Sequence, residues 1–209
     1  MDGAFMKKRY ITIILLVFCT VIMSTCAVLQ ADQRKLAEKL VRLHVVANSD
    51  SDFDQRVKLE VRDAVLEQAQ EIMDGSKNPK AALLRCLPEL KQAAEQRLSE
   101  LDVQSPVRVT LAKELFPTRT YDTFRLPSGV YTALRVTIGE GQGHNWWCVV
   151  FPSLCMTASM DELEQAAEAA GFSEAELRLI TEADSGYVIK FKTLELIQKL
   201  KTLLDFQRT

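Results

Sequence analysis

The sequence predicts an α+β protein: a mixed or antiparallel sheet packed with several helices, preceded by an N-terminal apolar signal or anchor helix. Segments with helical periodicity and segments with alternating periodicity follow one another without the regular strand–helix–strand order of a parallel α/β fold. The 209 residues are 47% hydrophobic and 26% charged, which is typical of a globular chain and too apolar for a disordered one. A single stretch is apolar enough to cross a membrane, which argues against a polytopic membrane protein.

The first thirty residues form a separate segment. A basic cluster at 7–9 precedes the 20 uncharged residues 10–29. A basic flank, an apolar run and small residues at its exit are typical of a secretory signal, with cleavage expected after Ala27. An uncleaved signal anchor is the alternative, because 20 apolar residues also span a bilayer. We therefore expect a signal peptide or signal anchor over 1–27 and an extracytoplasmic domain over 28–209.

The charge of the chain is unevenly distributed. The whole chain has a net charge of −2, whereas residues 28–209 hold 23 basic and 27 acidic residues, a net charge of −4. A balanced to acidic domain gives no electrostatic reason to bind nucleic acid, so we expect no nucleic-acid partner. The remaining 182 residues are enough for one substantial hydrophobic core.

The exported part begins with a strand and a long helix. A Val-rich run predicts a strand over 40–47. A polar turn follows, and the next helix is expected over 52–73. Ser51 and Asp54 resemble a capping box at its start, with Asp in the place of Glu.

Two basic side chains lie inside the apolar arc of this helix. On a helical wheel, Lys58 and Arg62 fall between apolar positions and away from the acidic side chains. Long basic side chains often pack their stems on apolar neighbours and keep the charge at the rim. The other interpretation is that both residues pair with carboxylates or face a binding partner.

A second helical segment and three strands follow. Leucines at helical spacing predict a helix from Asn78-Pro79 to Leu101, and Pro88 is expected to kink or split it. Two alternating runs predict strands, and a third run, apolar on both phases, predicts a strand covered on both faces. These three runs are 106–111, 130–138 and 146–151.

The connections and the tail complete the predicted fold. The glycine-rich segment 139–145 is expected to join the last two strands as a hairpin loop. The connection 116–129 has little periodicity, and loops of that length are often functional. The tail is expected to hold helices over 160–170, 173–181 and 193–206 and a strand over 187–191.

Candidate catalytic groups are few. The two histidines, His44 and His144, could in principle pair with Cys148 or Cys155, but neither cysteine begins a predicted helix that would lower its pKa. There is no zinc-ligand spacing, and the glycines of 139–143 lead into a strand instead of the helix that a phosphate loop needs. The sequence thus predicts no catalytic residue, no metal and no cofactor.

Cys148 and Cys155 form a candidate disulfide. They lie on either side of Pro152, which bends the chain between them. In an exported protein, a disulfide that closes this bend is one interpretation, and two buried free thiols are the other.

The two tryptophans of the chain, Trp146 and Trp147, are adjacent. Consecutive residues of a strand point to opposite faces, so at least one of the indoles can reach the core. Aromatic and arginine side chains dominate interface hot spots, which favours a recognition surface built from 116–121 and 143–146. The expected contact residues are Arg119, Tyr121, His144, Asn145 and Trp146, followed by Lys58 and Arg62.

Three motifs resemble the stage II sporulation protein R family. The first is RLHVVANSDS over 42–51, continued by Asp54-Gln55, Lys58 and VRDAV over 61–65. The second joins FPTRTY over 116–121 to LPxGxYxALRV over 126–136. The third is IGEGxGxNWWCVVFPxLC over 138–155, and it is highly specific. The resemblance spans most of residues 40–155, and the tail matches more loosely.

This resemblance implies a role in sporulation. Members of the family are made in the forespore of endospore-forming bacteria and are secreted across the cytoplasmic membrane into the space between forespore and mother cell. There they act as an intercellular signal that activates a membrane-embedded aspartic protease, stage II sporulation protein GA, which then processes pro-sigma E. The family is not known as an enzyme. The alternative function is an extracytoplasmic hydrolase acting on cell wall or peptide, for which the residues supply no recognisable catalytic set.

Overall fold

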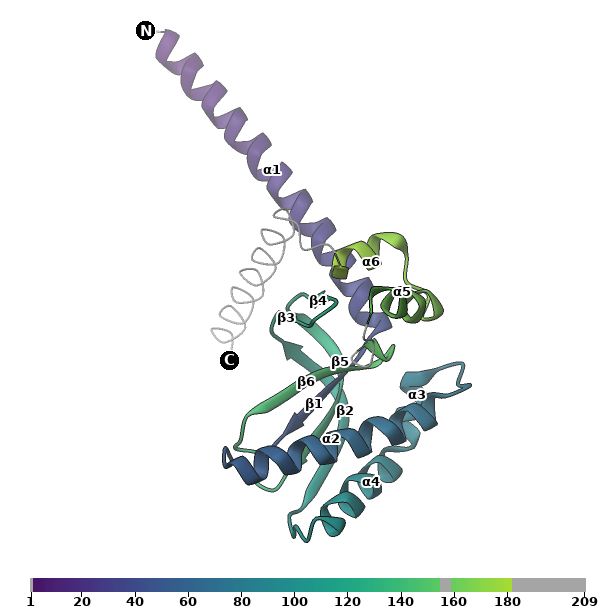
Figure 1. The fold of residues 1–209 in the computed structure, drawn as a ribbon. Helices are drawn as coiled ribbons and strands as arrows, with labels where there is room; N and C mark the ends of the chain where they lie inside the picture. Colours follow the sequence, from purple (N-terminus) through teal and green to yellow (C-terminus); the bar gives the residue numbers. More distant parts are fainter. Residues whose placement is uncertain (1, 155–158, 182–209) are drawn as a thin grey trace.

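The computed structural model describes residues 2–154 and 159–181, and it confirms the predicted α+β class (Figure 1). The elements in chain order are α1 (Asp2–Lys39), β1 (Val41–Val46), α2 (Asp52–Met73), α3 (Pro79–Arg85), α4 (Leu87–Glu100), β2 (Val107–Phe116), β3 (Arg119–Thr120), β4 (Arg125–Leu126), β5 (Gly129–Ile138), β6 (Asn145–Phe151), α5 (Met160–Ala169) and α6 (Glu174–Thr181). The strand expected over 187–191, the helix expected over 193–206 and Cys155 lie outside the described residues.

The sheet is mixed, with four strands in the order β2-β5-β1-β6. β1 runs parallel to β5 and antiparallel to β6, and β2 runs antiparallel to β5. The prediction that 139–145 closes a hairpin is therefore wrong, because β1 lies between β5 and β6. Because β1 lies inside the sheet, β1 is the strand covered on both faces, and all six of its residues are buried. β6 is an edge strand whose first two residues are exposed.

Several local predictions are confirmed. The Ser51 hydroxyl accepts a hydrogen bond from the Asp54 amide at 3.1 Å and caps α2, which ends at Met73 as expected. The second helix is split at Cys86, because Pro88 lies in the first turn of α4 and cannot donate to the preceding turn. β2 is longer than predicted and pairs with β5 over ten residues, from Val107↔Ile138 to Phe116↔Gly129.

Helices α2 and α4 cover one face of the sheet and enclose the main core. Every second residue of β1 and β5 points to this face, as the strand period requires. The core consists of apolar side chains that are almost fully buried, and each valine or leucine among them contributes about 1.5–3 kcal/mol to folding. It includes Val41, Leu43, Val45, Val57, Val61, Val65, Leu83, Leu90, Ala94, Leu98, Leu134 and Val136.

Described elements also cover one end of the opposite face of the sheet. There the last turns of α1, the β3–β4 hairpin, α5 and α6 form a second core with the strands. Lys39 at the end of α1 binds the Glu176 carboxylate of α6 at 2.5 Å and so ties these elements together. Members of this core include Leu36, Leu40, Phe116, Phe124, Leu126, Tyr131, Leu163 and Ile180.

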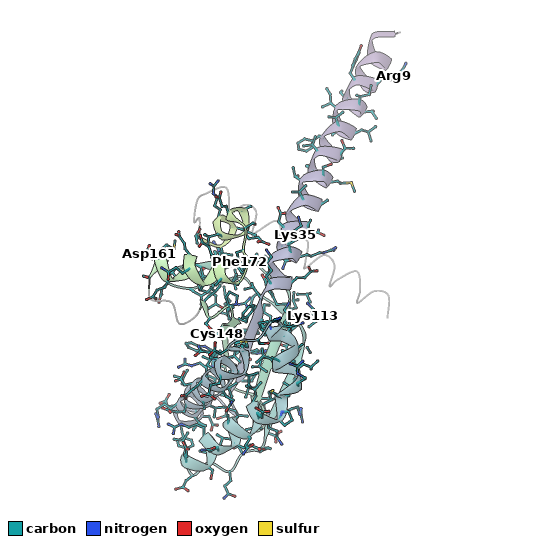
Figure 2. All side chains as sticks on the ribbon, turned by 90° about the vertical axis from the view of Figure 1, so that its right-hand side faces the viewer. Arg9, Lys35, Lys113, Cys148, Asp161 and Phe172 are labelled. Atoms are coloured by element: carbon teal, nitrogen blue, oxygen red, sulfur yellow. The ribbon has the colours of Figure 1, made fainter. Side chains whose placement is uncertain are left out.

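α1 projects away from the rest of the described domain (Figure 1, Figure 2). Large apolar side chains from Tyr10 to Val28 are exposed in it. The segment Arg9–Lys39 is long and apolar enough to cross a membrane, a test that an N-terminal signal sequence also passes. The helix continues through Ala27 without a break, and its last turns belong to the domain. Cleavage after Ala27 stays a prediction.

Candidate functional site

Beside the second core, the same face of the sheet carries a polar and aromatic cluster centred on His44, which is 5% exposed. Its Nδ1 lies 2.9 Å from Glu114 Oε2, and its Nε2 lies 2.8 Å from Asn145 Oδ1. The ring stacks on Trp147 with centroids 3.9 Å apart and meets Phe116 edge-on. His44 is thus fixed on four sides, and both ring nitrogens are engaged.

The sheet topology explains why these residues meet. His44 of β1 is paired in register with Trp147 of β6 and with Arg135 of β5. Glu114 of β2 then reaches across to His44 and also approaches Arg135, at 3.5 Å. Residues distant in sequence therefore share one face because β1 is central, and a linear motif search cannot show this.

A buried arginine lies behind this cluster. The Arg42 side chain has no exposed surface, and its guanidinium lies 4.2 Å from the Phe116 ring centroid and 5.0 Å from that of Tyr131. Its Nη2 donates to the Tyr121 hydroxyl at 2.8 Å. Its Nε and Nη1 are buried without a hydrogen-bond partner among the described residues. Burial lowers the pKa of Arg42, an effect that the nearby tyrosines Tyr121 and Tyr131 oppose.

The β3–β4 hairpin adds Arg119 and Tyr121 to the same end of the sheet. The Arg119 guanidinium lies 5.6 Å from the Trp147 ring centroid. The Tyr121 ring stacks on Phe124, and its hydroxyl donates to the Trp147 carbonyl oxygen at 3.3 Å. Burial raises the pKa of Tyr121, so its hydroxyl keeps its proton and remains a donor at neutral pH.

The opposite side of β6 presents Trp146, which is 38% exposed, to α2. The Arg62 guanidinium lies 4.5 Å from the Trp146 ring centroid and donates to Asp63 at 2.8 Å. Arg62 therefore pairs with a carboxylate at a solvent-facing rim, which agrees with the second interpretation of the sequence, pairing with carboxylates. Exposed cation–aromatic pairs of this kind are worth about 0.5–1 kcal/mol.

Lys58 has a different role from Arg62. It is 5% exposed, and its ammonium donates to Gln55 Oε1 at 2.6 Å and to the His144 carbonyl oxygen at 3.1 Å. Burial, followed by the repulsion from Arg62, lowers the pKa of Lys58. Its position indicates that it holds the loop before β6 and does not itself form a contact surface.

The glycine-rich loop 139–144 is packed on the turn that follows β1. Gly143 donates to the Ala47 carbonyl oxygen at 3.0 Å, and a Cβ at Gly143 would lie 2.2 Å from the Ser49 carbonyl oxygen. The exposed His144 contacts Asp50 through both its amide and its ring, at 2.6 and 2.5 Å. Close packing, rather than phosphate binding, explains the glycine at 143, and it fixes the start of β6.

A groove of about 390 Å³ runs beside β6. One wall is α2 at Arg62, Asp63 and Leu66, and the other is the hairpin turn from Thr120 to Phe124. Both tryptophans and Cys148 line it. The two halves of the predicted surface therefore meet at this edge strand.

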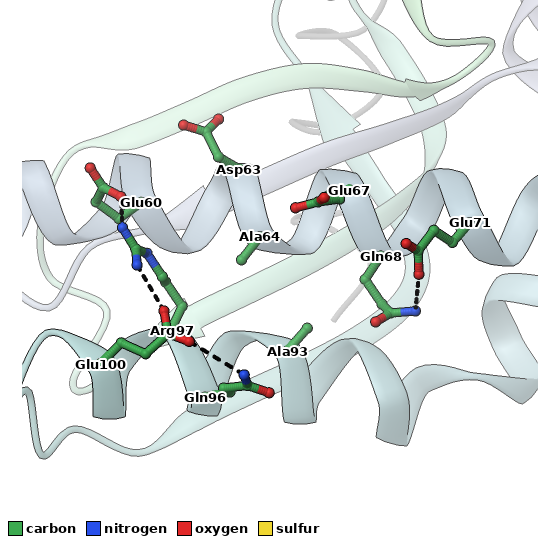
Figure 3. Close-up of a pocket in the computed structure, with 10 residues that line it drawn as sticks. All are labelled: Glu60, Asp63, Ala64, Glu67, Gln68, Glu71, Ala93, Gln96, Arg97 and Glu100. Atoms are coloured by element: carbon green, nitrogen blue, oxygen red, sulfur yellow. Dashed lines mark hydrogen bonds and ion pairs between the residues drawn. The ribbon is translucent and has the colours of Figure 1, made fainter.

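A second groove lies between α2 and α4 and is strongly acidic (Figure 3). Arg97 bridges the carboxylates of Glu60 and Glu100 across it. The remaining lining consists of two alanines and of polar side chains at helical spacing, as the sequence predicts for outward helix faces. It gives no indication of a ligand. No group of three or more metal-binding side chains occurs among the described residues.

The described residues form a small α+β domain carried on an apolar N-terminal helix. A family model described as stage II sporulation protein R matches residues 37–161, and the chain belongs to that family. Stage II sporulation protein R of Bacillus subtilis (strain 168) is 35% identical over 123 residues, which cover 57% of this chain and 55% of the relative. The match thus spans about half of that relative's length. No solved structure matches the chain.

The structure sorts the predicted contact residues into three groups. Arg119, Tyr121 and Asn145 belong to the His44 side of the sheet, and Trp146, Arg62 and His144 to the α2 side, whereas Lys58 is buried. The sequence interpretation missed Glu114, which has no distinguishing local pattern. It considered His44 only as a partner for cysteine. The Cys148–Cys155 bridge stays a prediction, because Cys155 lies outside the described residues.

Proposed function

We propose that this chain is an exported sporulation signal that binds and activates the membrane-embedded aspartic protease stage II sporulation protein GA. Activation leads to proteolytic processing of pro-sigma E in the mother cell. The chain acts from the space between forespore and mother cell and needs no enzymatic activity of its own. Membership of the stage II sporulation protein R family and an apolar N-terminal helix support this proposal.

The observation that carries the proposal is the pair of arginine–indole contacts on the two sides of edge strand β6. Arg62 lies over Trp146 and Arg119 over Trp147. Arginine and tryptophan are the residues most enriched in interface hot spots. A receptor that binds this edge better in its active state than in its inactive state is shifted toward the active state by the difference in affinity.

Co-expression of the full chain with the protease and its pro-sigma substrate in a non-sporulating host tests the proposal. Processing must require this chain. We expect Trp146→Ala to reduce processing at least about tenfold, the loss that follows from removing a hot-spot side chain. Leu84→Ala is the matched control, because Leu84 is an exposed apolar residue of α3, distant in sequence from the groove. A Trp146→Ala protein that folds normally and activates fully would contradict this surface.

The Glu114–His44–Asn145 array favours a second candidate, an extracytoplasmic hydrolase, because a carboxylate-oriented imidazole is a common general base. Under the proposed signalling role, the purified full chain releases no fragments from cell wall or a test peptide. Release that His44→Gln abolishes and Leu84→Ala preserves would instead establish the hydrolase.

A further inference from the structure

β6 is an edge strand of the sheet that the described residues form. β6 is the last strand in the order β2-β5-β1-β6, so one side of its backbone lacks a neighbouring strand in the described sheet. The groove beside it is walled by α2 and by the turn of the β3–β4 hairpin. An exposed sheet edge within a groove is the structure that extended peptides bind, since backbone hydrogen bonds supply affinity and side-chain contacts supply specificity.

The hairpin wall of this groove is backed by positive charge. Tyr121 lines the groove and receives its hydrogen bond from the fully buried Arg42. The charged or ionisable groups that shift the Arg42 pKa are Tyr121, Tyr131 and Arg119, and none of them is a carboxylate. Two polar atoms of Arg42 also have no hydrogen-bond partner within the described part of the chain. A buried cation without an anion is unfavourable, so this site favours an incoming negative charge.

We propose that this groove binds an extended segment of the receptor that pairs with β6 and places an acidic side chain against Tyr121 and Arg119, in the field of Arg42. The inference rests on the proposed function and specifies the chemistry of the partner. The carboxylate accepts hydrogen bonds from the Tyr121 hydroxyl and the Arg119 guanidinium. Tyr121 gives up only its 3.3 Å contact to the Trp147 carbonyl oxygen, which is a long hydrogen bond.

The other charges of the groove do not change the preference. Arg62 and Asp63 form an ion pair on the α2 wall, so each offsets the other. Asp122 lies at the exposed tip of the hairpin turn, where water screens it. Within the ranges that the structure describes, Arg42 and Arg119 form no ion pair with a carboxylate, so an acidic segment is preferred over a neutral or basic one.

A peptide probe tests the groove independently of the receptor. The probes are two nine-residue extended peptides of alternating threonine and valine, blocked at both ends, with a central glutamate or a central glutamine. The full chain in detergent is titrated with each, and indole fluorescence reports binding, since both tryptophans line the groove. We expect the glutamate peptide to bind at least about tenfold more tightly, as truncating a charge-assisted contact usually costs that much.

Two variants make this experiment specific. Arg119→Glu removes the preference for glutamate, and Arg119→Lys retains part of it. The matched control is Arg108→Glu, because Arg108 is exposed on β2, at the opposite edge of the sheet. Equal affinity for the two peptides, absence of binding, or an unchanged preference in Arg119→Glu would each overturn the inference.

The same variants separate this inference from the proposed function in the co-expression assay. A photo-crosslinking residue at position 122 of this chain identifies the receptor segment. When the acidic residue of that receptor segment is replaced by lysine, we expect the Arg119→Glu chain to activate processing again. Full processing by Arg119→Glu, or a crosslinked segment without an acidic residue, overturns the groove assignment. Failure of the unaltered chain to stimulate processing instead refutes the proposed function and leaves the peptide result to decide the inference.

Discussion

Replacement of Arg42 by methionine gives the sharpest test of how this domain is stabilised. Arg42 is fully buried between Phe116 and Tyr131, and its Nε and Nη1 have no hydrogen-bond partner among the described residues. Methionine fills a similar volume and carries no charge. The variant therefore removes both the desolvated cation and its contacts while leaving little new space.

The opposing contributions to the free energy of unfolding are of similar size. Each unsatisfied buried polar atom costs about 1–3 kcal/mol, so removing the two nitrogens gains about 2–6 kcal/mol. The two cation–aromatic contacts are worth about 0.5–2 kcal/mol each, and the charged hydrogen bond to Tyr121 about 1.5–3 kcal/mol. The gain and the loss nearly cancel. We expect Arg42→Met to change the free energy of unfolding by less than about 2 kcal/mol.

Urea unfolding of residues 28–209, followed by tryptophan fluorescence, measures this change. Arg42→Ala serves as the comparison, because it removes the same charge and also leaves a cavity, at a further cost of about 2–5 kcal/mol. If Arg42 instead had a buried carboxylate partner, its replacement would leave that carboxylate unpaired and would lower the free energy of unfolding by about 3–5 kcal/mol. A loss of 3 kcal/mol or more in Arg42→Met would therefore refute the reasoning.

Three further predictions follow from local geometry. Gly143→Ala should destabilise the domain by about 1–3 kcal/mol, because the new Cβ meets the Ser49 backbone. Gly75→Ala should cost about 1 kcal/mol, because Gly75 has a φ of +65° but no atom within 4 Å of the new Cβ. Thermal unfolding of the two variants compares these costs. Burial opposes ionisation of Glu176, but hydrogen bonds from Lys39 and Ser173 outweigh it and lower the pKa below 4.5. The attachment of α6 is thus complete above pH 4.5 and weakens as the pH falls through the lowered pKa, which hydrogen exchange of α6 detects. In non-reducing mass spectrometry, the exported protein should have the mass of residues 28–209 less two hydrogens if the segment is cleaved and Cys148 is bridged to Cys155.

Local sequence signals determine most of the elements because their causes are local. The cap by Ser51 at the start of α2 and the break before Pro88 depend on neighbours within four residues. The alternation of Val136 and Ile138 reports one buried sheet face. The pairing of β1 between β5 and β6 has no such signal, because it depends on contacts between residues about 90 to 110 positions apart. The hairpin prediction failed for that reason.

The candidate site divides in the same way. The motifs with Arg119, Asn145 and Trp146 are visible in the sequence and carry the family resemblance. Sequence distance conceals the contact of Glu114 with His44. It equally conceals the burial of Lys58, since a helical wheel shows the arc on which a residue lies but not what covers it.

The sequence by itself determined the family, the α+β class, the apolar leader and the segments that carry the specific motifs. Only the tertiary structure decided that β6 is an edge strand of the described sheet, that a groove lies beside it and that Arg42 is buried with no carboxylate from the described residues beside it. The physical reason is that the charge and the hydrophobic period are properties of one segment of sequence. Strand order and the desolvation of a side chain depend on how segments distant in sequence pack together.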